Sequence, residues 1–114
     1  MKERDFLFYG GHIKDFISSL SRGTREKFAY ALLLLRNQSR ISTKWIKYIN
    51  DGIYEIRIEF EGNIYRVFFI FDESNTVVLL NGFQKKSIKT PQSEFNIAQR
   101  LKKEYYEDKR TGRI

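Results

Sequence analysis

The chain has 114 residues, of which 41% are hydrophobic, 16% aromatic and 31% charged. This length and composition are typical of one globular domain and exclude an intrinsically disordered tail. With 21 Lys and Arg against 14 Asp and Glu, the net charge is +7, so we expect a polyanionic partner, either nucleic acid or an acidic protein.

The residue types that are missing narrow the chemistry. There is no cysteine, which excludes a disulfide framework, a thiolate nucleophile and a cysteine zinc site, and a lone histidine, His12, cannot build a metal centre. The apolar runs are far shorter than the roughly 20 residues of a membrane-spanning helix, and the beginning of the chain lacks an apolar signal core. We therefore expect a cytoplasmic protein without cofactor or metal, which acts by metal-independent chemistry or by binding alone.

The first half of the chain predicts one strand followed by two helices. Asp5–Tyr9 (DFLFY) is short and aromatic, as in a strand, and a short helix is expected over Ile13–Leu20. A longer helix should follow, with Thr24 as its N-cap and an end near Gln38. Its core face is predicted by apolar residues at helical spacing, namely Phe28, Ala31, Leu32 and Leu35.

The middle of the chain predicts a three-stranded meander. Ile53–Phe60 alternates between apolar and polar residues, as in a half-buried strand whose polar face includes Glu55 and Arg57. Glu61-Gly62-Asn63 is a tight-turn signal, so Ile64–Phe71 should return as the second strand of an antiparallel hairpin. Thr76–Phe83 is more uniformly apolar, which is expected of a strand that is central or covered on both faces.

A last helix should open with Thr90 as N-cap and Pro91 at its first position. Its apolar side would carry Phe95, Ala98, Leu101 and Tyr105. We expect a single domain over residues 1–114, with 1–4 and 109–114 frayed. The predicted fold is α+β with the order β-α-α-β-β-β-α, in which the N-terminal strand joins the antiparallel meander and the helices pack on one face of the sheet.

The hairpin brings two arginines together. If its loop is Glu61-Gly62, Arg57 lies directly opposite Arg66, and if the loop is Gly62-Asn63 the two are diagonal neighbours; both registers put them on one face. Like charges in opposition are unfavourable, so the pair requires either compensation by Glu55 and Glu59 or a functional role.

Two lysine-containing segments extend this cationic surface. Lys85, Lys86 and Lys89 follow the third strand of the meander and suit phosphate binding, although such a run by itself is more typical of a solvated loop. A second basic stretch, Arg36, Arg40, Lys44 and Lys47, is interleaved with aromatic residues. Its Trp45 and Tyr48 suit the stacking of single-stranded RNA bases, but aromatic residues more often cover the core.

The order of these motifs resembles the HigB-like, phage-associated branch of the RelE/ParE toxins, over about residues 5–107. The resemblance rests on the short segments GIYEIR (52–57), YRV (65–67), FQKK (83–86) and KTP (89–91). It implies a RelE-like fold and the toxin of a type II toxin–antitoxin pair. Such a toxin is an RNA interferase that enters the ribosome, cleaves translated mRNA and is restrained by a cognate antitoxin, which we expect to be of the helix-turn-helix type.

The resemblance also implies residue roles. The ribose 2′-hydroxyl would attack the adjacent phosphate, with Arg57, Arg66, Lys85 and Lys86 as catalytic residues, and RNA would be contacted by Lys44, Lys47, Lys89, Tyr65 and Asn81. Many relatives carry a histidine at the position of Asn81. Because an amide cannot titrate, a lysine, Tyr65 or the ribosomal RNA would have to assist proton transfer.

Two other functions remain open from the sequence. One is a non-catalytic toxin of the ParE type that acts on DNA gyrase, and the absence of the strand histidine keeps this alternative open. The other is a nucleic-acid-binding phage protein without toxicity.

Overall fold

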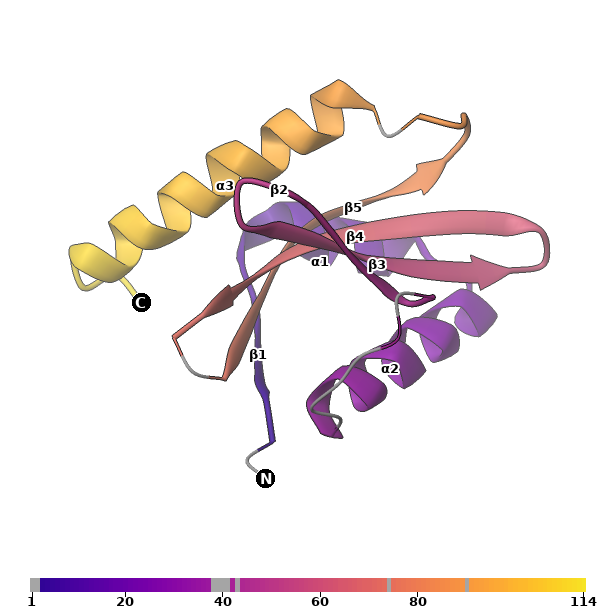
Figure 1. Cartoon of the computed structure of the whole chain (residues 1–114), viewed down its shortest axis with the longest axis horizontal. Coiled ribbons are helices and arrows are strands. Elements are labelled where there is room, and N and C mark those ends of the chain that lie inside the picture. Colours follow the sequence, from indigo (N-terminus) through magenta and orange to yellow (C-terminus); the bar gives the residue numbers. More distant parts are fainter. Residues whose placement is uncertain (1–2, 38–41, 43, 74, 90) are drawn as a thin grey trace.

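A computed structural model describes residues 3–37, 42, 44–73, 75–89 and 91–114. Within these residues the chain forms five strands and three helices (Figure 1). In chain order they are β1 (Asp5–Phe8), α1 (Gly10–Ser19), α2 (Arg22–Asn37), β2 (Ile46–Asn50), β3 (Ile53–Phe60), β4 (Asn63–Asp72), β5 (Thr76–Lys85) and α3 (Gln92–Arg110). The α+β class and the RelE-like arrangement predicted from the sequence are confirmed.

The strands form one mixed sheet in the order β1-β5-β4-β3-β2. β2 to β5 pair antiparallel in succession, but β1 pairs parallel to β5, with Asp5 opposite Thr76 and Phe8 opposite Leu79. The expectation of a purely antiparallel sheet was therefore wrong. Helices α1 and α2 follow β1 and cover one face of the sheet, and the meander then folds back to place β5 beside β1 (Figure 1).

Strand β2 was absent from the predicted order. It is a short edge strand whose Lys47 and Tyr48 are both exposed, so its sequence shows no clean alternation. The signal that locates it is the dipeptide Asp51-Gly52, whose φ angles of 54° and 72° form the two-residue turn into β3.

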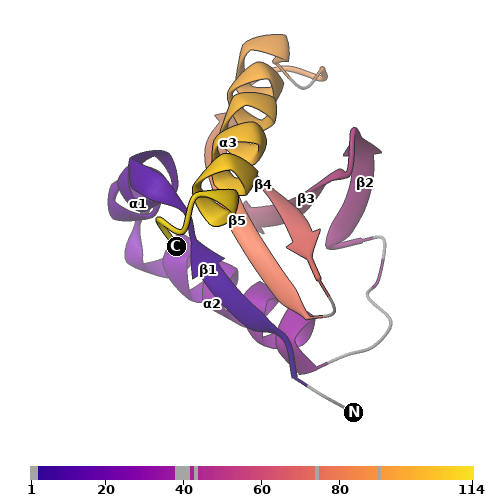
Figure 2. The same cartoon turned by 90° about the vertical axis from the view of Figure 1, so that its left-hand side faces the viewer.

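The helices cover both faces of the sheet, not one as predicted (Figure 2). Helices α1 and α2 bury Ile13, Phe28 and Leu35 against the face that contains Ile56 and Phe69. Helix α3 packs on the opposite face through the four predicted apolar residues, Phe95, Ala98, Leu101 and Tyr105. As a result, the β3 face that the alternation pattern assigned to solvent is partly a second core.

The ends of the helices differ in detail from the prediction. Helix α2 begins at Arg22, and the Ser21 hydroxyl accepts a hydrogen bond from the Thr24 amide at 3.2 Å, so Ser21 has the capping role expected of Thr24. Helix α3 begins at Gln92 after the extended Pro91, while Thr90 lies outside the described residues. No helix within the described residues is long and apolar enough to cross a membrane.

Candidate functional site

The centre of the candidate site is the pair of arginines predicted from the hairpin. Phe60 pairs with Asn63 across the two-residue loop Glu61-Gly62, and this register places Arg57 directly opposite Arg66. The loop has φ angles of 50° and 80°, as a type I′ turn requires. The local sequence therefore determines this juxtaposition, and the prediction is confirmed.

Each arginine has its own carboxylate, and the two pairs differ in exposure. Arg66 pairs with Glu55, and their side chains are 13% and 2% exposed. Arg57 pairs with Glu59 at 3.2 Å, and both of these side chains are substantially exposed. Arg66 is thus held in place by a buried partner, whereas Arg57 can exchange its carboxylate for a ligand at small cost.

Lys85 joins the arginines from the end of β5. Its register partner is Ile64, two residues before Arg66 on the same face of β4. Burial lowers the pKa of Lys85, and the positive charges of Arg66, Arg57 and Lys47 lower it further, against the opposing effect of Glu55. A lysine with a lowered pKa is more readily deprotonated, so this residue is the best placed of the group for proton transfer.

Lys47 completes the group from β2, where it is the register partner of Glu55. We call Lys47, Glu55, Arg57, Arg66 and Lys85 the cationic cluster. It combines four cations and one carboxylate from four neighbouring strands, on the sheet face that α3 also packs against.

Unused hydrogen-bonding capacity marks the same place. Within the described residues, three buried side-chain atoms lack a hydrogen-bond partner: Glu55 Oε2, Arg66 Nε and Asn81 Oδ1. In native structures nearly all buried polar side-chain atoms are paired, either with protein or with ordered water. Arg66 is also next to Phe83 in the ladder with β5, while Asn81 pairs with Phe68, one step further along the same face.

Asn81 itself is 2% exposed and binds the start of α3. Its side-chain amide donates to the carbonyl oxygen of Glu94 at 3.1 Å and to the Glu94 carboxylate at 3.3 Å. The residue therefore connects β5 to α3 behind the cationic cluster rather than presenting its amide on the surface.

The structure brings some of the other predicted residues to the cluster and leaves others apart. Lys86 and Lys89 are exposed in the loop after β5, and Lys44 is exposed just before β2. Tyr65 lies on the opposite face of the sheet, where its ring meets Phe16 of α1 at 6.4 Å between centroids. Arg40, part of the predicted basic stretch, lies outside the described residues.

Sequence reasoning missed the burial of Glu55. The alternation of β3 suggested a solvated carboxylate, but α3 covers that face and the residue is 1% exposed. The signal that could have revealed it is the apolar character of Ile53, which shares the face and is fully buried.

A comparison with known protein families gives one match. The family model described as Phage derived protein Gp49-like (DUF891) matches residues 15–103. This range contains every member of the cationic cluster. None of the curated proteins matches the chain.

Proposed function

Because the chain belongs to the phage-derived Gp49-like family, which is part of the RelE toxin-like superfamily, we propose that it is the toxin of a type II toxin–antitoxin pair. We propose further that it is closest to the HigB-like branch and cleaves translated mRNA on the ribosome. The observation that carries this proposal is the cationic cluster, in which Arg57, Arg66 and Lys85 gather on one face of the sheet.

The proposed reaction is an internal transfer at one phosphate. The ribose 2′-oxygen attacks the adjacent phosphorus and loses its proton, the bond from phosphorus to the 5′-oxygen breaks, and the departing 5′-oxygen takes up a proton. The products are a 2′,3′-cyclic phosphate and a 5′-hydroxyl. Negative charge builds on the phosphoryl oxygens in the transition state, and the guanidinium groups of Arg57 and Arg66 are suited to stabilise it.

Proton transfer has to come from a group other than Asn81, which cannot titrate. Lys85 is our candidate, because burial and the neighbouring cations lower its pKa and increase the fraction of neutral amine at a given pH. The neutral amine accepts the proton of the 2′-hydroxyl, and the resulting ammonium can return it to the 5′-oxygen. Lys86 and Lys89, exposed in the following loop, would bind flanking phosphates.

The direct test adds the purified protein to a translating extract and maps the ends of the mRNA. We expect cuts in translated message and none when translation is blocked. Intact mRNA at concentrations that arrest growth would reject the proposal. If supercoiling stops while mRNA stays whole, the protein is a gyrase-directed toxin, and an absence of arrest without any antitoxin would indicate a non-toxic nucleic-acid-binding protein.

Variants of the arginines make the test specific. Arg57→Ala removes an exposed guanidinium, so it should abolish mRNA cleavage and keep the fold. The matched control is Arg22→Ala, because Arg22 also pairs with an exposed glutamate, on α2 and outside the cluster. For Arg66 we suggest Arg66→Met combined with Glu55→Met, since the single change would leave Glu55 buried without its partner.

The partner that follows from this proposal is an antitoxin, expected to be a helix-turn-helix protein with an acidic segment that neutralises the cationic cluster. Coexpression should then restore growth, and a stable complex of the two proteins should be isolated. Recovery of growth without any complex would contradict direct neutralisation.

A further inference from the structure

A hollow of about 400 Å³ opens beside the cationic cluster, at the edge of β3 that β2 leaves uncovered. Its walls come from three parts of the chain: Lys27 of α2, Lys44 and Trp45 before β2, and the hairpin from Arg57 to its turn. Arg57 belongs to both the hollow and the cluster. The volume is within the range of roughly 300–1,000 Å³ that is usual for small-ligand pockets.

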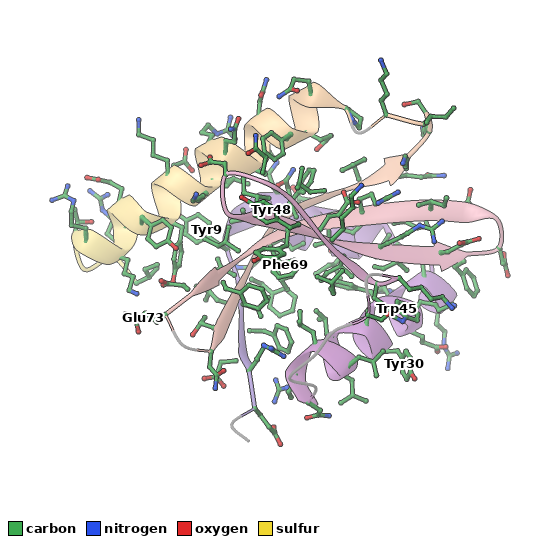
Figure 3. All side chains as sticks on the ribbon, viewed as in Figure 1. Tyr9, Tyr30, Trp45, Tyr48, Phe69 and Glu73 are labelled. Carbon is green, nitrogen blue, oxygen red and sulfur yellow. The ribbon has the colours of Figure 1, made fainter. Side chains whose placement is uncertain are left out.

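A backbone hydrogen bond fixes the position of Trp45, the aromatic residue of the hollow, relative to Arg57. The pairing of β2 with β3 ends at Ile46 and Ile56, and one step beyond it the Arg57 amide donates a hydrogen bond to the Trp45 carbonyl oxygen at 2.7 Å. The indole packs edge-on against Tyr30 of α2, with ring centroids 6.2 Å apart, and Figure 3 shows the two side chains next to each other beside this helix. Trp45 is thus held from two sides and is partly exposed.

Cations surround this ring. The Lys27 and Lys44 ammonium groups lie 6.0 and 5.7 Å from the centre of the indole, and Arg57 lines the same hollow. Two carboxylates also line the hollow: Glu59 pairs with Arg57 at 3.2 Å, and Glu61 lies in the turn, so the three cations exceed the acidic residues by one. An aromatic platform with several cations is the combination that holds a base by stacking and its phosphate by charge.

We propose that this hollow binds one nucleotide of single-stranded RNA, with its base against Trp45 and its phosphate at Lys27 and Lys44. The inference rests on the proposed function, because the bound nucleotide would be adjacent to the phosphate held at Arg57. It assigns Lys27, which no sequence motif indicated, and Lys44 to substrate binding. The hollow would determine which nucleotide of the message is positioned next to the reacting phosphate.

The single tryptophan of the chain provides a readout that is independent of activity. We would titrate the protein with a short RNA that carries 2′-O-methyl groups throughout and cannot be cleaved, and would follow the fluorescence of Trp45. Stacking of a base should quench the emission with saturation. The double variant Lys27→Gln/Lys44→Gln keeps the tryptophan and should lower the affinity about tenfold or more.

The control is Lys14→Gln/Lys103→Gln, which removes the same charge from exposed positions on α1 and α3. An equal loss of affinity in both double variants would overturn the inference, because net charge would then explain binding. Absence of quenching would also overturn it, even if the protein cleaves mRNA. Saturable quenching that depends on Lys27 and Lys44, in a protein that cleaves no mRNA, would support the hollow and reject the proposed function.

Discussion

Glu55 carries the single negative charge of the cationic cluster, and its side chain is only 2% exposed. Glu55→Ala would leave the largely buried Arg66 without its partner, so we expect a decrease of about 3 kcal/mol in the free energy of unfolding. Urea denaturation would measure it. Glu59→Ala is the matched control, because Glu59 pairs with the more exposed Arg57 and should contribute less than about 1 kcal/mol. Equal effects of the two changes would contradict this difference in burial.

A second buried carboxylate, Asp72, lies at the far end of β4. It accepts hydrogen bonds from Tyr105 at 2.6 Å and from Lys109 at 2.8 Å, which connect the end of α3 to the sheet. Burial raises the pKa of Asp72, but these hydrogen bonds and the charge of Lys109 outweigh it, and the net pKa lies below the ordinary 3.8. The segment from Lys109, expected to fray, therefore begins with two residues, Lys109 and Arg110, that are helical and ion-paired.

This pKa direction predicts acid sensitivity. The folded protein binds fewer protons at Asp72 than the unfolded chain does, so its contribution to stability is present above pH 3.8 and is lost as the pH falls through the lower, folded-state pKa. We expect Asp72→Asn to be less stable at neutral pH and to show a shallower loss of stability below pH 4. Denaturation curves at a series of pH values would show it, and identical slopes for the two proteins would contradict it.

Between elements, a glycine sets how closely α1 approaches β5. The ring of Phe16 lies over Gly82, where an added Cβ would be only 2.6 Å from two ring carbons. Gly82→Ala should therefore displace the ring and lower the free energy of unfolding by about 1–3 kcal/mol.

The same substitution at Gly11 is the control. Gly11 is on α1, the helix that carries Phe16, but an added Cβ there would have no neighbour within 4 Å. Gly11→Ala should leave stability unchanged or raise it by up to about 1 kcal/mol, because alanine favours the helix. Thermal or urea unfolding of both variants gives the comparison, and a loss at Gly11 equal to that at Gly82 would mean that the packing of Phe16 is not the cause.

At the level of helices and strands, the periodicity of apolar residues predicts some features of the fold and not others. The helical spacing of Phe28, Ala31 and Leu35 predicted the core face of α2, and the alternation in β3 predicted the face that packs against it, because local spacing determines which side of an element is apolar. The same patterns contain no information on which sheet face a helix covers. The position of α3, on the face opposite to α1 and α2, therefore appeared only in the structure.

For the whole molecule, the net charge of +7 predicts that RNA binding weakens as salt rises, because bound cations release counterions from the phosphates. Each phosphate contact should contribute about 0.7 to the slope of log K against log salt for single-stranded RNA. Lys86→Gln should reduce the slope by about that amount. Lys14→Gln, an exposed change on α1, should not, and fluorescence anisotropy with uncleavable RNA would measure both. Equal slopes for the two variants would show that Lys86 does not contact a phosphate.

The candidate site, like the fold, was predicted in part from the sequence and in part appeared only in the structure. The sequence by itself determined the pairing of Arg57 with Arg66, because a two-residue turn sets the register of its own hairpin. It also determined the cationic balance and the motif order that led to the toxin superfamily.

Only the tertiary structure decided what surrounds those arginines. It placed Lys47 opposite Glu55 through a fifth strand, buried Glu55 on the sheet face that α3 packs against, and brought Lys27 from α2 to Trp45. The physical reason is the range of the interactions. Turn geometry and side-chain alternation act over a few residues. The burial of Glu55 and the lowered pKa of Lys85 instead arise from segments that are far apart in the chain and meet only in the folded sheet with its helices.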